Sequence, residues 1–298
     1  MRYAFIDGQS DAYPTESLCK AMMVSPSGYT NWKARSHGAK PGGKRLSDDH
    51  LLTLIRAIHA RTKGAYGSPR IYDELKDAGH PVGKRRVERL MREHGLKARY
   101  KRRFKATTDS KHSLPVAPNV LDRKFMPSLP NAAWVADITY ISTSEGWLYL
   151  AVVIDLYDRA VVGWLIRPRM NADIVIDALT MAWFRRRPPT GLLHHSDRGS
   201  QYASQAFQDK LIAYGMKCSM SRKGNCWDNA VAESFFNNLK NERVHGRRYA
   251  TRDQARADVF DYIETFYNRS RRHSALLGKT PASAFEAWVL KQQGKMAA

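Results

Sequence analysis

The chain has 298 residues, a formal net charge of +21 at pH 7 and a sequence pI near 10.0. This length allows two or three domains with at least one sizeable core, and a charge so far from neutral makes a polyanion, most simply nucleic acid, the expected partner. An ordinary enzyme with a solvated basic surface, or a basic ribosomal or membrane-surface protein, is the alternative from charge alone.

The three cysteines Cys19, Cys218 and Cys226 form no CxxC pair and no Cys/His spacing suited to zinc. This usage predicts reduced thiols of a cytosolic protein. No apolar run approaches the roughly 18 residues of a membrane span, and the first residues lack the apolar stretch of a signal peptide. We therefore expect a soluble, cytosolic protein.

Two short helices are predicted between Tyr13 and Ala34, where Leu18 and Met22 are apolar and the SPSGY turn restarts the chain. This N-terminal helical region, residues 1–44, is interpreted as a packing arm rather than a small helix-turn-helix fragment, because the stretch is too short to bury a core of its own.

Residues 45–105 predict a helix-turn-helix domain of three helices. Ser47 is a candidate cap for the first helix, Ser68 starts the second, and Gly79 marks the turn before the third. The apolar positions of the third helix are Val87, Leu90 and Met91. Its outward basic side chains are Lys84, Arg85, Arg86, Arg89 and Arg92. This is the layout of a recognition helix that enters the major groove of DNA.

Positive charge is concentrated around this domain. From Lys33 to Lys105 there are 21 Lys and Arg residues against 7 Asp and Glu residues, which accounts for 14 of the net +21. A further basic run follows the third helix, with Tyr100 and Phe104 interleaved. Its candidate DNA contacts are Arg99, Lys101, Arg102 and Arg103. A basic helix alone is as often simply solvated, but the adjoining run favours a DNA-tracking surface, with each neutralised phosphate adding about one unit to the salt dependence.

The next region, residues 106–130, is rich in proline and predicts a linker. From Trp134 the pattern becomes α/β. Three consecutive strand candidates, WVADITYIS, WLYLAVVIDLY and AVVGWLIRP, are followed by alternating helices and strands. This order suits a mixed sheet with helices on its faces and predicts a core over residues 131–245.

Three acids occupy positions where an unpaired carboxylate is costly. Asp137 lies inside a β-branched strand candidate, Asp197 follows a short apolar strand, and Glu233 lies on an amphipathic helix. Burying an unpaired carboxylate costs several kcal/mol or neutralises it, so a cation is the natural compensation. Carboxylate oxygens suit Mg²⁺, and two ions about 3.5–4 Å apart would flank a phosphodiester.

Other polar residues compete for these roles. Periodicity alone does not separate Asp155 in VVIDLYDR from Asp137, because both lie in apolar strands. The remaining candidates receive structural interpretations: Asp228, or its neighbour Asn229, as a helix cap, Glu242 as a solvent-facing or Arg-paired acid, and His194 and His195 as strand-end residues near DNA rather than metal ligands.

The order of Asp137 in WVADITYI, Asp197 in HHSDRGSQY and Glu233 in DNAVAESFFNNLKNE, with 35 residues between the last two acids, resembles the DDE transposase and integrase superfamily. More closely, it resembles the second-reading-frame (orfB) transposases of the insertion sequence three family. The resemblance runs from about Leu46 to Glu286. It favours Asp137 over Asp155. Lys240 lies seven residues past Glu233, two helical turns along the same face, matches the basic residue that accompanies the family's glutamate and is a further candidate DNA contact.

The resemblance implies a ribonuclease H-like core with a mixed five-stranded sheet and flanking helices. It also implies that Asp137, Asp197 and Glu233 are both catalytic and metal-binding, with two Mg²⁺ ions and Mn²⁺ as the expected substitute. One ion would activate water to nick the element end, and the 3′-hydroxyl so formed would attack a second phosphodiester in line. In the family the first product is a circularised element.

Two further regions carry candidate DNA contacts. The loop SRKGNCWDN contributes Arg222 and Lys223, while Trp227 is expected either to meet DNA or to pack over the core. A helical tail, residues 246–298, contributes Arg271 and Arg272, which suit phosphate.

The sequence therefore predicts a DDE-type transposase. The alternative is a DNA-binding accessory or regulatory subunit that needs fusion to, or partnership with, an upstream-frame product, and a nuclease without strand-transfer ability shares the metal site. The expected partners are double-stranded DNA of the element ends and target, and further copies of the chain. We expect no membrane association and a place in the prokaryotic cytoplasm at the nucleoid.

Overall fold

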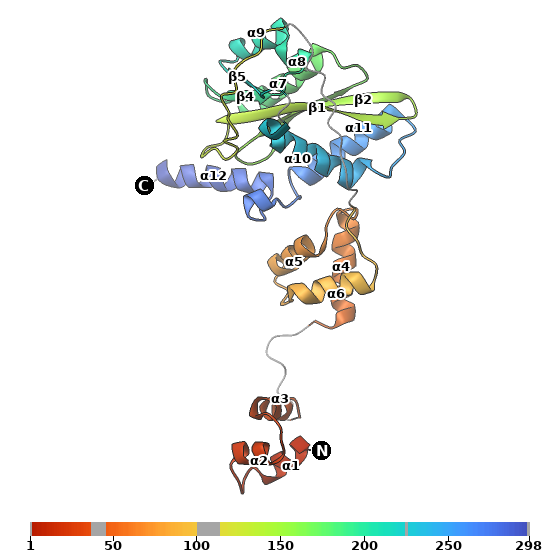
Figure 1. The fold of residues 1–298 in the computed structure, drawn as a ribbon, viewed down its shortest axis with the longest axis vertical. Helices are drawn as coiled ribbons and strands as arrows, with labels where there is room; N and C mark the ends of the chain where they lie inside the picture. The colour runs from red at the N-terminus through yellow and green to blue at the C-terminus, as the bar shows by residue number, and fades with distance from the viewer. Residues whose placement is uncertain (1, 37–45, 100–113, 224–225, 297–298) are drawn as a thin grey trace. The chain divides into compact units, whose positions relative to one another are not determined.

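The computed structural model describes residues 2–36, 46–99, 114–223 and 226–296, and Figure 1 gives their order along the chain. The chain divides into two compact units. The first comprises Met1–Arg61 with Gly67–Lys97, and the second comprises Thr62–Tyr66 with Ala98–Ala298. The finer domain limits expected from the sequence remain predictions.

The first unit begins with three helices, of which the second and third are the two expected between Tyr13 and Ala34. They are α1 (Arg2–Gln9), α2 (Thr15–Ala21) and α3 (Pro26–Ser36). Ile6, Cys19 and Tyr29 are buried together, and Tyr3 and Trp32 pack around them. The region thus buries a small core of its own, contrary to the expectation of a packing arm without one.

The same unit holds the three helices of the helix-turn-helix region: α4 (Asp48–Arg61), α5 (Ser68–Asp77) and α6 (Lys84–Glu93). The Ser47 hydroxyl accepts a hydrogen bond from the His50 N–H at 3.2 Å, so the predicted cap is present. The inward apolar positions are Leu51, Leu52, Ile55, Ile71, Leu75, Val87, Leu90 and Met91. The helical spacing read from the sequence is therefore confirmed for all three helices.

The second unit is built on a mixed five-stranded sheet with the order β3-β2-β1-β4-β5. The strands are β1 (Ala133–Thr143), β2 (Gly146–Asp155), β3 (Val161–Arg167), β4 (Leu193–Ser196) and β5 (Lys217–Met220). The first three pair antiparallel, whereas β4 runs parallel to both β1 and β5. The predicted sheet is confirmed, and β1 lies at its centre.

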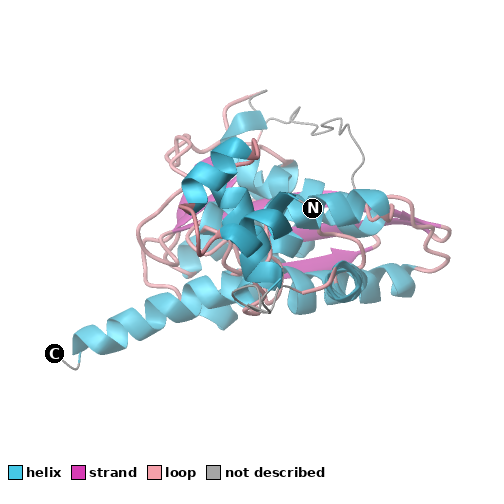
Figure 2. Cartoon of the chain, turned by 90° about the horizontal axis from the view of Figure 1, so that it is seen from below, coloured by secondary structure: helices cyan, strands magenta, loops and turns pink. Residues whose placement is uncertain are grey.

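Helices lie on both sides of the strands (Figure 2). On one face, alternate strand residues such as Trp134 and Ala136 pack into a core under three helices. These helices are α7 (Ala172–Arg186), α8 (Ser200–Ala203) and α9 (Gln205–Ala213). Helix α10 (Ala230–Leu239) packs against β1, and its first turn carries Glu233.

The chain after α10 is a helical tail, as predicted. It contains the π-helical stretches Lys240–Val244 and Asp261–Tyr267, with α11 (Arg252–Phe260) between them and α12 (Pro281–Met296) at the end. In a π-helix the chain is wound more widely than in an α-helix, so each such stretch changes which side chains face the core. None of the described helices is both long enough and apolar enough to cross a membrane.

Gly163 in β3 allows α7 to approach the sheet closely. A Cβ added at Gly163 would lie 2.1 Å from the Ala178 carbonyl oxygen and 2.7 Å from the Ala182 Cβ. We expect Gly163→Ala to lower the free energy of unfolding by about 3 kcal/mol, because backbone atoms must move to admit the methyl group. Thermal or denaturant unfolding measures this loss. Gly83→Ala is the matched control because nothing lies within 4 Å of its added Cβ, and equal stability of the two variants would contradict the packing argument.

Candidate active site

Asp137 lies in the middle of the central strand. It pairs with Val152 of β2 across the antiparallel ladder, and its Oδ1 accepts a hydrogen bond from the Ile138 N–H at 2.8 Å. The side chain is half-buried. The β-branched and aromatic sequence around it makes this strand, and the strand fixes where the carboxylate stands.

Asp197 and Glu233 come from two other elements. Asp197 follows the last residue of β4, and its Oδ1 accepts a hydrogen bond from the Gly199 N–H at 2.9 Å. Because β4 runs parallel to β1, its carboxyl end delivers Asp197 beside the central strand. Glu233 lies in the first turn of α10, which packs on β1, and is half-buried.

The three carboxylates act on one another electrostatically. Burial, followed by the negative charge of Asp197, raises the pKa of Asp137 well above its usual value, and the charge of Glu233 adds to this. Burial also raises the pKa of Glu233. The structure therefore brings the three predicted acids into one neighbourhood. The charges of Asp197 and Glu233 there disfavour the charged form of Asp137.

This donor set fits a hard divalent cation. Three carboxylates offer only oxygen ligands, as Mg²⁺ prefers. The positive charge of a bound cation would offset the repulsion between their negative charges. Among the described residues, no three His, Cys, Asp or Glu side chains are already arranged to hold a metal ion. The acids thus share one neighbourhood without forming a finished ligand set.

Lys240, a candidate DNA contact, belongs to this neighbourhood and is buried. The residue is 6% exposed, and its Nζ lies 4.9 Å from the centroid of the Tyr140 ring on β1. Burial lowers its pKa to about 8, while the charge of Asp137 opposes that shift. Helix α10 is regular up to Leu239, so Lys240 keeps its two-turn spacing from Glu233, and the packing of α10 on β1 buries it.

Asp155, the rival of Asp137, has a structural role. Its carboxylate is buried and accepts hydrogen bonds from the Asn131 and Tyr157 N–H groups at 2.8 and 2.9 Å. Burial, followed by the charge of Asp158, raises its pKa to about 7. These backbone contacts fix the end of β2 and the start of β1.

His194 and His195 are both buried on β4. Burial lowers the pKa of His194 to about 3 and that of His195 to about 4, so both rings are neutral near pH 7. The nitrogens of His195 lie 2.8 Å from the Ser219 hydroxyl and 3.2 Å from the Ser221 hydroxyl. The interpretation of both histidines as strand-end residues near DNA rather than metal ligands remains a prediction, and the structure shows both rings buried in the sheet.

Asp228 is the centre of an ion-pair network, not the helix cap predicted from its position. Its side chain is fully buried, and it accepts hydrogen bonds from Arg222 Nε at 2.9 Å, Arg123 Nε at 3.0 Å and Asn119 Nδ2 at 2.9 Å. Arg222, more than any other group, lowers the pKa of Asp228 below its usual range. The N-cap of α10 is Asn229, whose side chain makes no capping hydrogen bond.

This network changes the interpretation of the loop before α10. Arg222 was predicted to contact DNA, but its guanidinium holds Asp228 while its side chain remains about half exposed. Lys223 and Trp227 are exposed, which excludes the alternative that Trp227 is packed over the core. Sequence inspection does not find the network, because Asn119 and Arg123 lie more than a hundred residues from Asp228.

Arg271 was predicted to bind DNA phosphate, and the structure contradicts this. It is 2% exposed, its Nη2 lies 2.7 Å from Glu242 Oε1, and its Nε lies 2.9 Å from Glu242 Oε2. The Tyr262 hydroxyl donates to the same carboxylate at 2.8 Å. Glu242 is therefore the Arg-paired acid of the two alternatives. Arg272 is half-buried, and its Nη1 donates to the Gly278 carbonyl at 3.3 Å.

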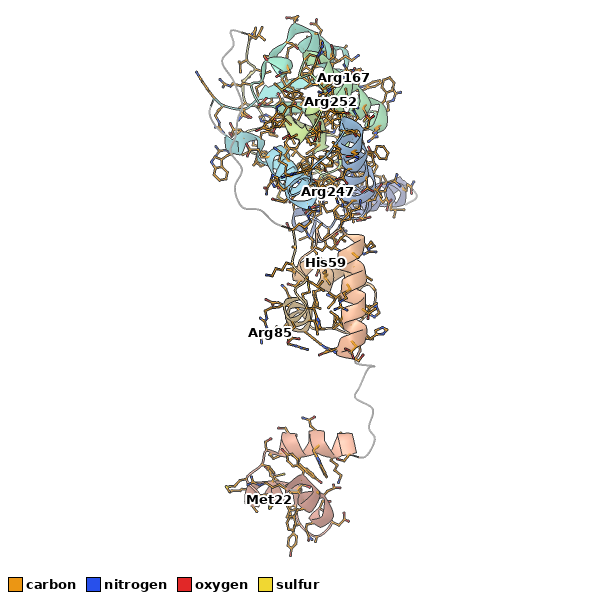
Figure 3. All side chains as sticks on the ribbon, turned by 90° about the vertical axis from the view of Figure 1, so that its right-hand side faces the viewer. Met22, His59, Arg85, Arg167, Arg247 and Arg252 are labelled. Carbon is orange, nitrogen blue, oxygen red and sulfur yellow. The ribbon has the colours of Figure 1, made fainter. Side chains whose placement is uncertain are left out.

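The basic residues of α6 divide into two groups. Arg86 and Arg89 donate to the carboxylate of Asp48 at 2.7 and 2.6 Å, so both brace α6 against α4. The others, Lys84, Arg85 and Arg92, are exposed, and Arg85 is labelled in Figure 3. Arg99 is half-buried and donates to the His245 carbonyl at 3.0 Å, whereas the candidates Lys101, Arg102 and Arg103 lie outside the described residues.

The sheet order, the helix on its central strand and the three acids define the class of ribonuclease H-like polynucleotidyl transferases. The chain matches the model described as "Integrase core domain" over residues 127–226 and a second model of that description over residues 214–281. It matches the model described as "HTH-like domain" over residues 47–104.

Curated relatives cover nearly the whole chain. It is 42% identical over 281 residues to "Transposase InsF for insertion sequence IS3A" of Escherichia coli K12, which spans 94% of this chain and 97% of that one. It is 46% identical over 271 residues to "Insertion element IS600 uncharacterized 31 kDa protein" of Shigella sonnei, which spans 91% and 98%. The chain belongs to the IS3 family of transposases, and it is a DDE-type polynucleotidyl transferase.

A solved structure with a looser likeness is the "HTLV-2 integrase catalytic core domain in complex with magnesium (dimeric form)". It is 23% identical, covers 52% of this chain and 95% of that one, and has a TM-score of 0.39.

Proposed function

We propose that this chain nicks DNA at the ends of an insertion sequence and joins the freed strand to a second phosphodiester, with Asp137, Asp197 and Glu233 as its catalytic and metal-binding residues. The observation that supports the assignment is the convergence of three elements on one carboxylate: burial, and then the negative charges of Asp197 and Glu233, raise the pKa of Asp137 well above its usual value. Two Mg²⁺ ions, with Mn²⁺ as substitute, would supply Lewis-acid activation of the attacking oxygen and stabilisation of the leaving oxygen.

The chain's own residues position the reacting groups. Backbone amides of Ile138 and Gly199 each hold one oxygen of an aspartate, which orients the two carboxylates. Lys240 places a positive charge beside Asp137 and against the Tyr140 ring. In that position it would balance the acids and meet a phosphate that enters the site.

A single assay tests the proposed function. The purified chain is mixed with Mg²⁺ and DNA that ends in the element's own terminal repeats, and nicked and joined products are scored. We expect both products. Nicking without joining of a precut end would identify a nuclease, and binding without cleavage would identify an accessory subunit that needs an upstream-frame product.

We further propose that α6 reads the terminal DNA through Arg85 and Arg92, which are exposed and two helical turns apart on one face. Arg85→Ala with Arg92→Ala is expected to weaken binding and to flatten the slope of log affinity against log salt by about two units, because each phosphate contact contributes about 0.9. Gel-shift titrations over a salt series measure this slope. Lys217→Ala with Lys291→Ala removes the same charge from exposed positions outside the module, and an equal change in both variants would refute recognition by α6.

The expected partners are the double-stranded DNA of element and target and further copies of this chain, with an upstream-frame product as an additional one. The expected location is the prokaryotic cytoplasm at the nucleoid, where that DNA lies.

A further inference from the structure

The first three helices of the chain contain a second helix-turn-helix. Helices α2 and α3 are joined by the four residues 22–25, whereas the six residues 78–83 separate α5 from α6. A turn of three or four residues is typical of DNA-binding helix-turn-helix motifs, which place their second helix in the major groove. The pair formed by α2 and α3 therefore fits this motif at least as well as the pair formed by α5 and α6.

Local hydrogen bonds fix the turn between α2 and α3. The Val24 N–H donates to the Cys19 carbonyl at 3.0 Å across Met23, whose φ of 52° is left-handed. This is the pattern of a Schellman motif, which ends a helix sharply. Ser25 then caps α3, because its hydroxyl accepts a hydrogen bond from the Gly28 N–H at 3.0 Å. The end of α2 and the start of α3 are thus both set by the chain at the turn.

Helix α1 completes a three-helix module over residues 2–36 (Figure 1). Each of α1, α2 and α3 contacts the other two, and their shared core contains Ile6, Cys19 and Tyr29. The Asp7 carboxylate of α1 accepts a hydrogen bond from the Tyr29 hydroxyl at 2.8 Å and pairs with Lys33 Nζ at 2.9 Å. These contacts fix which side of α3 faces inward.

The outward side of α3 is polar. It carries Ser27, Thr30, Asn31 and Ala34, which are exposed and follow one another at the helical spacing that places side chains on one face. Serine, threonine and asparagine side chains hydrogen-bond to base edges and phosphates, and alanine packs on the thymine methyl group. The surrounding sequence favours a polyanion, because residues 17–47 contain six Lys and Arg residues and no Asp or Glu residue.

We propose that residues 2–36 are a second DNA-binding module, in addition to α4–α6, and that α3 enters the major groove of duplex DNA with the face that carries Ser27 and Thr30. The inference rests on the proposed action at element ends. Two modules on one chain would read two stretches of terminal DNA, and each would raise the effective concentration of the other at its site. The exposed apolar residues Phe5, Tyr13 and Met23 would instead suit a protein partner, but none of these three lies on α3.

The test compares two double variants that add the same charge to this module. Ser27→Glu with Thr30→Glu changes the outward face of α3, and Ala4→Glu with Gln9→Glu changes exposed positions of α1. The full chain is used in gel-shift titrations and in hydroxyl-radical footprinting on DNA that ends in the element's terminal repeats. We expect the α3 variant to bind about tenfold more weakly, as loss of one or two base contacts implies, and to lose one of two protected stretches. The α1 variant should match the wild type.

Equal binding by the two double variants, or an unchanged footprint of the α3 variant, would overturn the second module. Unchanged DNA binding together with a loss of self-association, measured by light scattering, would assign residues 2–36 to protein contacts and would overturn it as well. These outcomes leave the proposed function intact, because the wild-type chain would still bind and cleave its DNA. Failure of the wild-type chain to bind element-end DNA would refute both.

Discussion

Asp137→Asn, Asp197→Asn and Glu233→Gln are each expected to abolish nicking and strand joining, with a loss of roughly 10³-fold or more. An amide has nearly the shape of the carboxylate but lacks the charge that would hold a cation at the scissile phosphate. DNA binding through the helix-turn-helix region should remain, because none of the three acids belongs to the first unit. Cleavage assays with Mg²⁺ and gel-shift assays on the same preparations separate the two properties.

Asp137→Asn is also expected to change the stability of the fold. Burial, and then the charges of Asp197 and Glu233, raise the pKa of Asp137, so the folded state disfavours its ionised form at neutral pH. Stability therefore falls as the pH rises from the unfolded pKa through the folded one. We expect Asp137→Asn without divalent cation to unfold at a higher temperature than the wild type at pH 7. Asp209→Asn, an exposed control, should leave activity and stability unchanged. Ordinary activity in any of the three active-site variants would refute the site.

Arg271→Met is expected to lower the free energy of unfolding by about 3–5 kcal/mol. The substitution leaves the carboxylate of Glu242 buried without the guanidinium that now donates three hydrogen bonds to it. Glu242→Met should lower the free energy of unfolding by a similar amount, because it leaves the guanidinium of Arg271 buried without its carboxylate. The double variant should recover most of the loss, since an apolar pair of similar volume replaces a buried ion pair at little or no net cost.

A double-mutant cycle on unfolding measures this coupling. The salt dependence of DNA binding is the companion measurement, because a buried Arg271 should leave the salt slope of the double variant equal to that of the wild type. A flattened slope with little loss of stability would instead restore the phosphate contact expected from the sequence.

The strands were predictable because strand period and turn residues are local signals, whereas the topology of the sheet came from the family resemblance. A carboxylate in a β-branched run stands out against its neighbours, but this holds for Asp155 as well as for Asp137, and only the resemblance separates the two. Arg271 was misjudged because its partner lies 29 residues away in sequence, and a basic cluster looks the same whether it is solvated or paired. Asp228 was misjudged because a helix cap and a long-range ion-pair centre have the same local sequence.

Lys240 shows a third kind of limit. Helical spacing indicates that Lys240 shares a face with Glu233, but it carries no information on the Tyr140 ring of β1 that lies against the Lys240 ammonium group.

The hydrogen bonds between Asp228 and the residues before the sheet decide where a stable fragment of this protein can begin. Asn119 and Arg123 donate hydrogen bonds to Asp228, just ahead of α10, and the Val120 and Leu121 amides donate to the Ser219 hydroxyl at 2.9 and 3.2 Å. A recombinant fragment that starts at residue 127, where the matched integrase region begins, would discard this brace. A fragment that keeps these contacts with the integrase core therefore has to begin upstream of Asn119.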